Sequence, residues 1–296
     1  LRQVLTIAES NSMNEAAKKL FVSQPNLSAT VREVEEELGI TVFMRNNRGI
    51  TVTAEGEEFL GYAKQVVEQY HLLENRYLNV ESKKKFSVSM QHYSFAVKAF
   101  VQLAKEVGMD EYEFAVHESK TKEVIVNVKN LKSETGVLYL SDFNEKVLRK
   151  LFKECDIEFK ELFTCNTYVY LWKKHPLASK KVITLDDLQE YPCLTFEQGV
   201  NNSFYYAEET RSTYDYKRVI KADDRATKLN LMVGLNGFTL CSGIISEDLN
   251  GDDYAAIPLK ESEKMHIGYI KHKGTKLSKL GEIYIDALKN YENKVL

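Results

Sequence analysis

Apolar residues recur every three or four positions through the first forty residues of the chain, which is the spacing of amphipathic helices. After an N-terminal stripe, Ser12 opens a capping box that predicts the start of a second short helix. Ser23 is the expected N-cap of a third helix, which runs to about Leu38 and stops ahead of Gly39. The apolar stripe of this third helix consists of Leu27, Val31, Val34 and Leu38.

A second face of the third predicted helix carries polar side chains suited to DNA. Gln24, Ser28 and Arg32 stand four residues apart on it. Gln and Ser read base edges, and Arg donates to guanine or phosphate. Two short helices joined by a tight turn, the second exposing such a face, predict a helix-turn-helix whose second helix enters the major groove. The alternative is an ordinary small helical bundle, since any such bundle shows an apolar stripe and a polar face.

A hairpin is predicted after the third helix, because the pattern there changes to a period of two. Residues 41–44 are expected to form a strand, 45–49 a turn and 50–53 the return strand. The tip carries Arg45 and Arg48, spaced to touch phosphates or a minor groove. Residues 1–53 are therefore predicted to be a winged helix-turn-helix.

A long helix capped by Thr53 is predicted to extend to about Val80, and residues 54–82 are interpreted as a linker and dimerisation segment. Its apolar residues alternate spacings of four and three, which is the heptad pattern of a helix that pairs with a copy of itself. The alternative is a helix that lies on its own globular core. The predicted seam consists of Phe59, Ala63, Val66, Tyr70, Leu73, Tyr77 and Val80.

The first eighty residues resemble the DNA-binding region of the LysR-type transcriptional regulators. The resemblance rests on Ala8, Ser10, Ser12, Ala16, Ala17, Leu20, Ser23, Gln24, Pro25, Leu27, Ser28, Val31, Glu35 to Gly39, Val42 to Arg45, Arg48, Thr53 and Gly56. It implies DNA contacts at Gln24, Pro25, Ser28 and Arg48. The family often has Arg where this chain has Ala29, so a contact made there is expected to be lost or moved. The full candidate DNA-binding set is Ser23, Gln24, Pro25, Ser28, Thr30, Arg32, Arg45 and Arg48.

Strands and helices alternate through the remaining two hundred residues, which predicts parallel strands with crossover helices. The expected strands are 86–90, 112–116, 136–140, 168–172, 193–196, 219–222, 237–241, 255–259 and 266–270, and the expected helices are 94–107, 121–131, 144–152, 227–235 and 277–291. Two such units predict an α/β domain over residues 83–296 with a cleft between two lobes. Lobe I is expected at about 83–161 and 268–296, and lobe II at about 162–267.

The resemblance extends to this region through His175 to Ala178, Ile183 to Leu188 and Leu231 to Phe238. It implies an effector-binding domain of the type II periplasmic-binding-protein kind. The family usually continues the strand after this last segment with Leu-Pro, whereas this chain has Ser242 and Gly243, so we expect a different local pocket wall.

Polar residues that follow the predicted strands are the candidate ligand contacts, because small ligands bind outside the carboxyl ends of parallel strands. Ordinary loop solvation is the alternative for each of them. Ser94 and the amides beside it suit a carboxylate, whereas Asp223 and Asp224 favour a ligand with amine or hydroxyl donors, so the ligand chemistry stays open. The candidate effector-binding set is His92, Tyr93, Ser94, Ser141, Asp142, Gln198 and Asp223.

Composition narrows the class of protein. The chain has 296 residues, of which 44% are hydrophobic and 28% charged, which excludes a disordered or fibrous chain. Its net charge of −3 argues against sequence-blind binding of polyanions. No apolar stretch is long enough to span a bilayer, so we expect no membrane partner and a cytoplasmic protein. Four scattered cysteines and six scattered histidines offer no disulfide framework and no metal-ligand spacing.

Motifs for phosphate cradles, nucleophile elbows and metalloproteases do not occur, so we expect no enzyme, no cofactor and no metal. The sequence therefore predicts a ligand-responsive transcription regulator that forms a dimer or tetramer. Its expected partners are a pseudo-palindromic operator in double-stranded DNA, a small-molecule effector and RNA polymerase. The competing hypotheses are a solute-binding protein and an enzyme on the same two-lobed scaffold.

Overall fold

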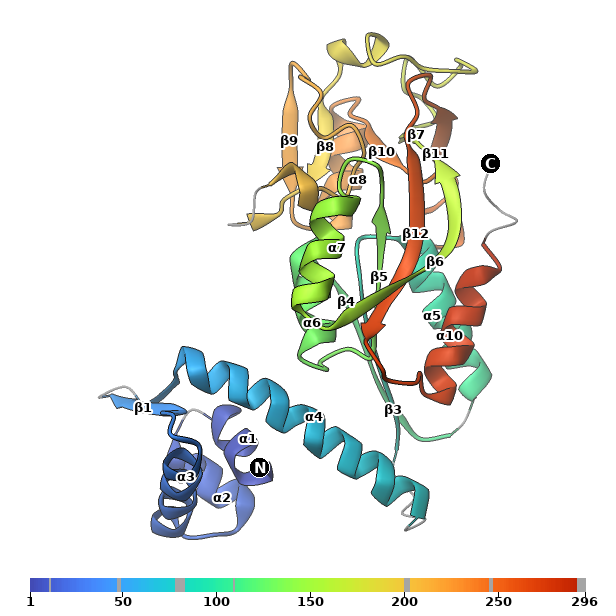
Figure 1. Ribbon diagram of the computed structural model, residues 1–296. Helices are drawn as coiled ribbons and strands as arrows, with labels where there is room; N and C mark the ends of the chain where they lie inside the picture. The colour runs from blue at the N-terminus through green and yellow to red at the C-terminus, as the bar shows by residue number, and fades with distance from the viewer. Residues whose placement is uncertain are drawn as a thin grey trace. The chain divides into compact units, whose positions relative to one another are not determined.

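The computed structural model describes residues 1–10, 12–46, 49–77, 83–108, 110–199, 203–244 and 247–291. Its internal contacts divide the chain into two compact units, residues 1–82 and 83–296, both of which are drawn in Figure 1. Among the described helices, none combines the length and the apolar character that a bilayer crossing requires.

The first unit consists of helices and one hairpin. Ser12 Oγ accepts a hydrogen bond from the backbone N–H of Glu15 at 3.2 Å, and Ser23 Oγ accepts one from Asn26 at 3.4 Å, so both predicted caps are confirmed. Gly39 ends the third helix with φ +67°, as expected. The elements are α1 (Arg2–Ala8), α2 (Met13–Leu20), α3 (Gln24–Leu38), β1 (Phe43–Asn46), β2 (Gly49–Val52) and α4 (Ala54–Tyr77).

The hairpin begins two residues later than predicted. The Glu35 carboxylate accepts hydrogen bonds from the backbone N–H groups of Val42 and Phe43, at 2.7 and 3.0 Å. These bonds tie the chain to α3 just before the two strands begin to pair. The strands pair from Phe43 opposite Val52 to Asn46 opposite Gly49. The tip of the wing, residues 47–48, lies outside the described residues.

The second unit contains lobe I, a five-stranded sheet in the order β4-β3-β5-β12-β6. Strand β3 is parallel to β4 and β5, whereas β12 is antiparallel to β5 and β6. The strands are β3 (Lys84–Met90), β4 (Tyr112–Glu118), β5 (Thr135–Leu140), β6 (Ile157–Asn166) and β12 (Lys264–His272).

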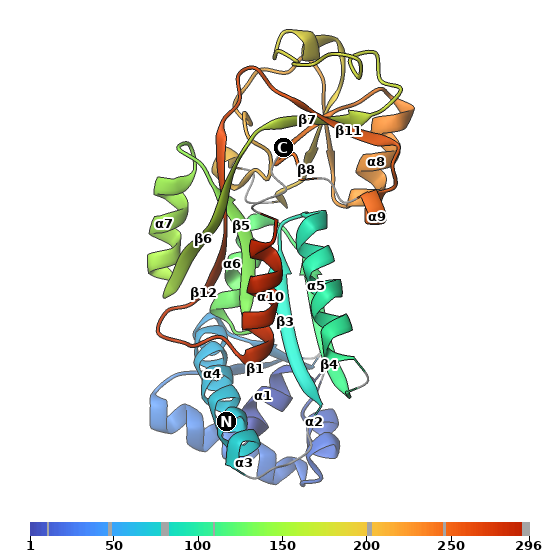
Figure 2. The ribbon, with the colours of Figure 1, turned by 90° about the vertical axis from the view of Figure 1, so that its right-hand side faces the viewer.

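Helices cover both faces of this sheet, as Figure 2 shows. The pair α5 (Ser94–Val107) and α10 (Lys279–Lys289) buries one core, which includes Phe95 and Tyr284. The pair α6 (Thr121–Lys129) and α7 (Glu145–Glu154) buries a second core on the opposite face. Because both faces are covered, β5 is buried at every residue.

Lobe II is built around β7 (Tyr168–Trp172), which pairs antiparallel with β10 (Thr239–Cys241) and β11 (Tyr254–Pro258). Beside it lie the parallel strands β8 (Cys193–Phe196) and β9 (Val219–Ala222). The remaining elements are α8 (Arg225–Gly234), the short helix α9 (Glu247–Asn250) and the 3-10 turns η1 (Asp187–Glu190) and η3 (Phe204–Tyr206).

The mixed α/β class is confirmed, and two expectations are corrected. The alternation predicted parallel strands throughout, but β12, β10 and β11 are antiparallel to their neighbours. Strand β6 was not predicted, because its ten residues alternate irregularly between buried and exposed. Strands β6 and β12 stay in the sheet of lobe I along their whole length, so residues 162–166 and 264–267 belong to that sheet and not to lobe II.

Candidate functional site

The N-terminal turn of α3 presents the first group of predicted DNA-binding residues. Ser23 and Pro25 are exposed there, and Gln24 is half-buried. The expectation that Ser28 stands on an open face is wrong, because its side chain is buried at 4% exposure. Its hydroxyl accepts a hydrogen bond from Gln24 Nε2 at 2.8 Å, so Ser28 orients Gln24 from below.

The other predicted DNA-binding residues differ in exposure and in whether their side chains already have a partner within the protein. The Thr30 hydroxyl donates to the backbone oxygen of Asn26, one helical turn earlier, at 3.2 Å. Arg32 is exposed on α3. The side chain of Arg45 and the whole of Arg48 lie outside the described residues.

The predicted seam of α4 falls into two parts. Ala63 is buried at 2% exposure within the first unit, and Phe59 is half-buried, so the first part faces the unit's own helices. Further along, Val66, Tyr70 and Leu73 are 54, 49 and 56% exposed. An exposed row of large apolar side chains on one helix marks an interaction surface. The side chain of Tyr77, and Val80, lie outside the described residues.

Contacts from α1 fix the orientation of this helix. The Arg2 guanidinium lies 4.9 Å from the centre of the Tyr70 ring and donates to Glu74 at 2.9 Å. These two contacts join α1 to the exposed part of the seam.

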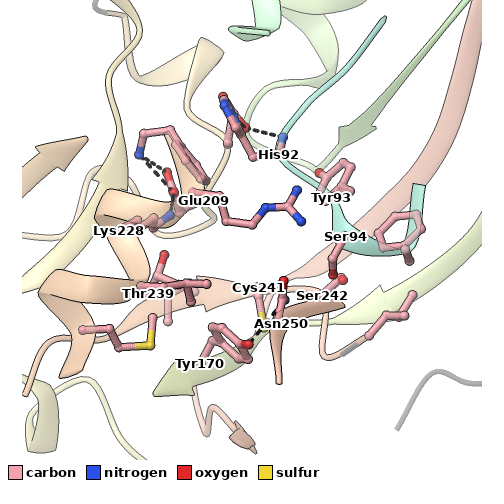
Figure 3. Close-up of a pocket in the computed structure, with 18 of the residues that line it drawn as sticks. His92, Tyr93, Ser94, Tyr170, Glu209, Lys228, Thr239, Cys241, Ser242 and Asn250 are labelled. Atoms are coloured by element: carbon pink, nitrogen blue, oxygen red, sulfur yellow. Dashed lines mark hydrogen bonds and ion pairs between the residues drawn. The ribbon is translucent and has the colours of Figure 1, made fainter. Parts of the chain in front are cut away.

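A cavity of about 100 Å³ lies between the lobes of the second unit, and Figure 3 shows its lining. His92, Tyr93 and Ser94, at the junction of β3 and α5, line it from lobe I, and all three belong to the predicted effector-binding set. Ser94 is the first residue of α5, so its hydroxyl and the adjacent amides lie at the positive end of that helix. The residues of the lining that the sequence did not single out include Tyr170, Phe196, Glu208, Glu209, Arg225, Lys228, Thr239, Cys241 and Asn250.

The other four predicted effector contacts do not line this cavity. Ser141 is buried at the start of α7, where its N–H donates to Asn144 Oδ1 at 2.8 Å, and Asp142 is exposed to solvent. Asp223 is exposed and pairs with Lys120 at 3.3 Å. Gln198 lies behind the wall, where it contacts both lobes. Position after a strand was therefore too coarse a criterion, because the predicted residues that follow β5 in lobe I and β8 and β9 in lobe II do not line the cavity.

A buried ion pair forms part of the lobe II wall. Lys228 Nζ lies 2.5 Å from Glu209 Oε1, and the two side chains are only 6 and 5% exposed. The Lys228 ammonium also lies 3.7 Å from the centre of the Phe196 ring, and the Phe196 N–H donates to Glu209 at 3.2 Å. Burial raises the pKa of Glu209, and Lys228 opposes that shift. Nothing in the sequence around residues 196–209 indicated this pair, because the stretch has no helical or strand period.

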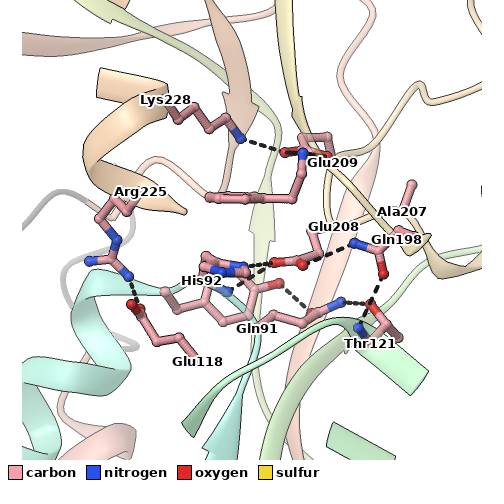
Figure 4. Close-up of polar contacts among 12 residues, drawn as sticks. Gln91, His92, Glu118, Thr121, Gln198, Ala207, Glu208, Glu209, Arg225 and Lys228 are labelled. Carbon is pink, nitrogen blue, oxygen red and sulfur yellow. Dashed lines mark hydrogen bonds and ion pairs between the residues drawn. The ribbon is translucent and has the colours of Figure 1, made fainter. Parts of the chain in front are cut away.

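Polar contacts tie the lobes together beside the cavity, as Figure 4 shows. Glu208 Oε2 accepts from the backbone N–H of His92 at 2.9 Å and lies 2.9 Å from His92 Nδ1, and the His92 ring stacks on Phe196 at 3.8 Å. Glu208 Oε1 accepts from Gln198 Nε2 at 3.0 Å, and Gln198 Oε1 accepts from the Thr121 N–H at 3.2 Å.

One more ion pair crosses between the lobes, from Arg225 at the start of α8 to Glu118 at the end of β4. Both lobes thus form the wall of the cavity, and lining residues such as His92, Glu208 and Arg225 also make the contacts between the lobes. A ligand that changes those contacts changes the arrangement of the lobes.

The chemistry of the wall favours binding over catalysis. Cys241 and His92 both line the cavity, but burial raises the pKa of the Cys241 thiol to about 11, so it stays protonated at neutral pH. Among the residues that the structure describes, no three His, Cys, Asp or Glu side chains gather as a metal site.

Comparisons with known proteins assign both units. The family described as "Bacterial regulatory helix-turn-helix protein, lysR family" matches residues 1–57, and the family described as "LysR substrate binding domain" matches residues 147–292. The HTH-type transcriptional regulator CysL of Bacillus subtilis (strain 168) is 24% identical to this chain. The similarity extends over 100% of this chain and 98% of CysL. The uncharacterized HTH-type transcriptional regulator YkuM of the same organism is 40% identical over 76 residues, which are 25% of this chain and 26% of that protein.

A solved structure shows the same fold. Full-length OxyR from Pseudomonas aeruginosa, in a cysteine-to-aspartate variant, is similar with a TM-score of 0.69 and 18% identity, over 97% of this chain and 93% of that one. A DNA-binding helix-turn-helix joined to a two-lobed binding domain defines a ligand-responsive transcriptional regulator. The chain belongs to the LysR family of bacterial transcriptional regulators, with a DNA-binding unit and an effector-binding domain. It is a regulator and not an enzyme, which sets aside both competing hypotheses.

Proposed function

We propose that this regulator binds a pseudo-palindromic operator as a dimer or tetramer and that an effector in the cavity between the lobes controls that binding. We assign residues 1–53 to DNA binding, 54–82 to linkage and pairing, and 83–296 to effector binding. RNA polymerase is the further partner of a regulator bound at a promoter. Because the regulator acts on DNA, we propose that it works in the cytoplasm.

DNA reading is assigned to α3 and the wing. Gln24, held by Ser28 at 2.8 Å, is the side chain best placed for a base edge, because a pre-oriented amide loses little entropy on binding. Ser23, Pro25, Thr30 and Arg32 are assigned further contacts from the same helix and its N-cap, and Arg45 and Arg48 supply phosphate contacts from the wing.

Pairing is assigned to the exposed part of the α4 seam. Val66, Tyr70 and Leu73 expose roughly half of their surface, although Ala63 on the same seam is buried. Burial of such side chains against a partner helix removes apolar area from water. Two paired α4 helices fix the separation of two recognition helices, which is what an operator with two half-sites requires.

Effector control is assigned to the cavity because of one observation: its wall consists of residues from both lobes, and cross-lobe contacts run through it. His92 and Arg225 both line the cavity and both reach across to the other lobe. A ligand in contact with them has different affinities for different lobe arrangements, so its binding shifts the equilibrium between them.

A selection experiment tests this function. The purified full chain is incubated with a library of random-sequence DNA duplexes, and the retained duplexes are sequenced. We expect enrichment of an inverted repeat with two half-sites, and sizing chromatography is expected to show a dimer or tetramer. A monomer that enriches single half-sites, or a chain that enriches no sequence, contradicts the proposal.

A further inference from the structure

The Arg225 guanidinium is only partly used by the protein. Its side chain is 20% exposed, lines the cavity and belongs to the first residue of α8. Within the described part of the chain, its single hydrogen bond runs from one terminal nitrogen to Glu118 in lobe I. A guanidinium has five N–H donors, so most of its donors are left for another acceptor.

Other donors of the wall are also unfilled. The Lys228 ammonium has one oxygen partner among the described residues, Glu209. The hydroxyl of Thr239, a residue that is 6% exposed, has none in the described structure, and Figure 3 shows this residue in the lining. A buried donor without an acceptor costs about 1–3 kcal/mol, so an acceptor that reaches it is favoured. Ser94, at the start of the 14-residue helix α5, adds a donor on the lobe I side.

The two carboxylates of the wall, in contrast, are occupied. Glu208 is bound by His92 and Gln198, and Glu209 by Lys228 and the Phe196 N–H. A cationic ligand would have to displace these buried partners. Much of the remaining wall is apolar and fits a small hydrocarbon body: Phe95, Leu229, Met232, Leu240, Ile244 and Met265.

We propose that the effector is a small organic anion whose carboxylate takes the place of Glu118 on Arg225. This inference deepens the proposed function and depends on it, since it takes the cavity as the effector site. Asp223 and Asp224, which were expected to favour a ligand with amine or hydroxyl donors, are not among the lining residues: Asp223 pairs with Lys120, and Asp224 caps α8 by accepting from the Thr227 N–H at 2.8 Å.

Exchange is favoured over simple addition because of where the two partners lie. Glu118 is 31% exposed and its carboxylate is rehydrated on release, whereas Arg225 is less exposed and needs a partner. Because Glu118 belongs to lobe I and Arg225 to lobe II, the exchange removes one ion pair between the lobes. The binding of the anion is thereby coupled to the lobe arrangement.

Matched ligands test the class of effector. Acetate, butyrate and benzoate are each compared with the corresponding amide and amine, which keep the body and change the charge of the head group. The readout is the melting temperature of the full chain, which a ligand of the folded state raises with concentration. We expect at least one carboxylate to raise it, with no shift from its amide or amine. No shift from any carboxylate, or a larger shift from an amine or amide, overturns the inference.

Three variants separate this inference from the proposed function. For the carboxylate that binds, Arg225→Gln is expected to weaken binding at least about tenfold, and Glu118→Gln to strengthen it about fivefold, because the competing carboxylate is gone. If Arg225 acted only as a structural residue, Glu118→Gln would not strengthen binding, and that result overturns the exchange.

Leu229→Trp fills the cavity. If an amine binds and Leu229→Trp abolishes its binding, the cavity remains the effector site and only the anion is wrong; a shift that survives Leu229→Trp contradicts the site itself.

Discussion

Glu208 of lobe II lies 2.9 Å from both the backbone nitrogen and the ring Nδ1 of His92 in lobe I. Gln198 Nε2 donates to the other oxygen of Glu208, so three polar groups contact this one buried carboxylate. Glu208→Ala leaves them unpaired, and we expect it to lower the free energy of unfolding of the second unit by about 2–4 kcal/mol. Glu208→Gln keeps an acceptor oxygen and is expected to cost about half as much.

Urea unfolding followed by circular dichroism measures both losses, and Glu123→Ala, at an exposed position of α6, is the control, expected within about 0.5 kcal/mol of the parent. If Glu208→Ala proves no more costly than this control, the cross-lobe contact does not hold the lobes.

Ser28 and Gln24 give a prediction on DNA reading. Ser28→Ala removes the hydroxyl that holds Gln24 Nε2, so Gln24 regains rotamer freedom. We expect the variant to keep its affinity for unrelated DNA and to lose about fivefold to thirtyfold in its preference for the selected operator, which is the lower part of the range of about 1–3 kcal/mol for one bidentate base contact. Competition gel shifts at fixed salt measure the ratio. Asn26→Ala, in the same turn of α3, is the control, and an unchanged ratio in Ser28→Ala would show that Gln24 does not read a base.

Val66 gives a prediction on assembly. It is 54% exposed in the single chain, so Val66→Glu leaves the fold of the first unit intact but places a charge in the paired seam. We expect the dissociation constant of the dimer to rise by at least about a hundredfold, because a buried unpaired charge costs several kcal/mol. Analytical ultracentrifugation measures it, with Glu68→Lys, at an exposed position on the side of α4 away from Val66 and Tyr70, as the control. A dimer that is equally stable in both variants would place the interface elsewhere.

The thiols give a prediction on reactivity. Burial raises the pKa of Cys241 to about 11 and that of Cys165 to about 12. At pH 8 fewer than about one in a hundred of these groups is ionised, and the thiolate is the reactive form. We expect iodoacetamide to label the half-buried Cys155 first in the folded protein, and all four cysteines at similar rates in urea. Peptide mass spectrometry follows each site, and rapid labelling of Cys241 in the folded chain contradicts its assignment as an inert wall residue.

Local patterns were sufficient for most of the fold. The helix over residues 94–107 and the strands over 168–172, 193–196 and 219–222 were predicted to the residue, because each combines a clear period with a turn or cap at its ends. Strand β6 escaped prediction because it twists past β12 with a shift in register beside Gly268, so its buried positions do not alternate. Such a strand is specified by its partners and not by its own sequence.

The candidate site was predicted only on its lobe I side. His92, Tyr93 and Ser94 follow a regular strand and open a regular helix, so their position could be inferred from neighbours in the sequence. Glu209 and Lys228 lie 19 residues apart in the sequence, and no local period reports their contact. A buried ion pair of this kind can be recognised only when the positions of both segments in the fold are known.

Glu134 gives a prediction on pH dependence. Its carboxylate accepts from the backbone N–H of Ser278 at 2.7 Å and from the Ser278 hydroxyl at 2.8 Å, just ahead of α10. Burial raises the pKa of Glu134, and the hydrogen bonds from Ser278 only partly oppose it. Because the folded pKa lies above the unfolded one, the folded state holds more protons in the interval between them, so the contribution of Glu134 to stability falls as the pH rises through that interval. Glu134→Gln has no such titration. We therefore expect the stability of the parent relative to Glu134→Gln to be greatest near pH 4 and to decline towards pH 7, in urea titrations of both proteins at each pH. Glu123→Gln serves as the exposed control, and a difference that grows with pH would show that the folded pKa of Glu134 is lowered instead.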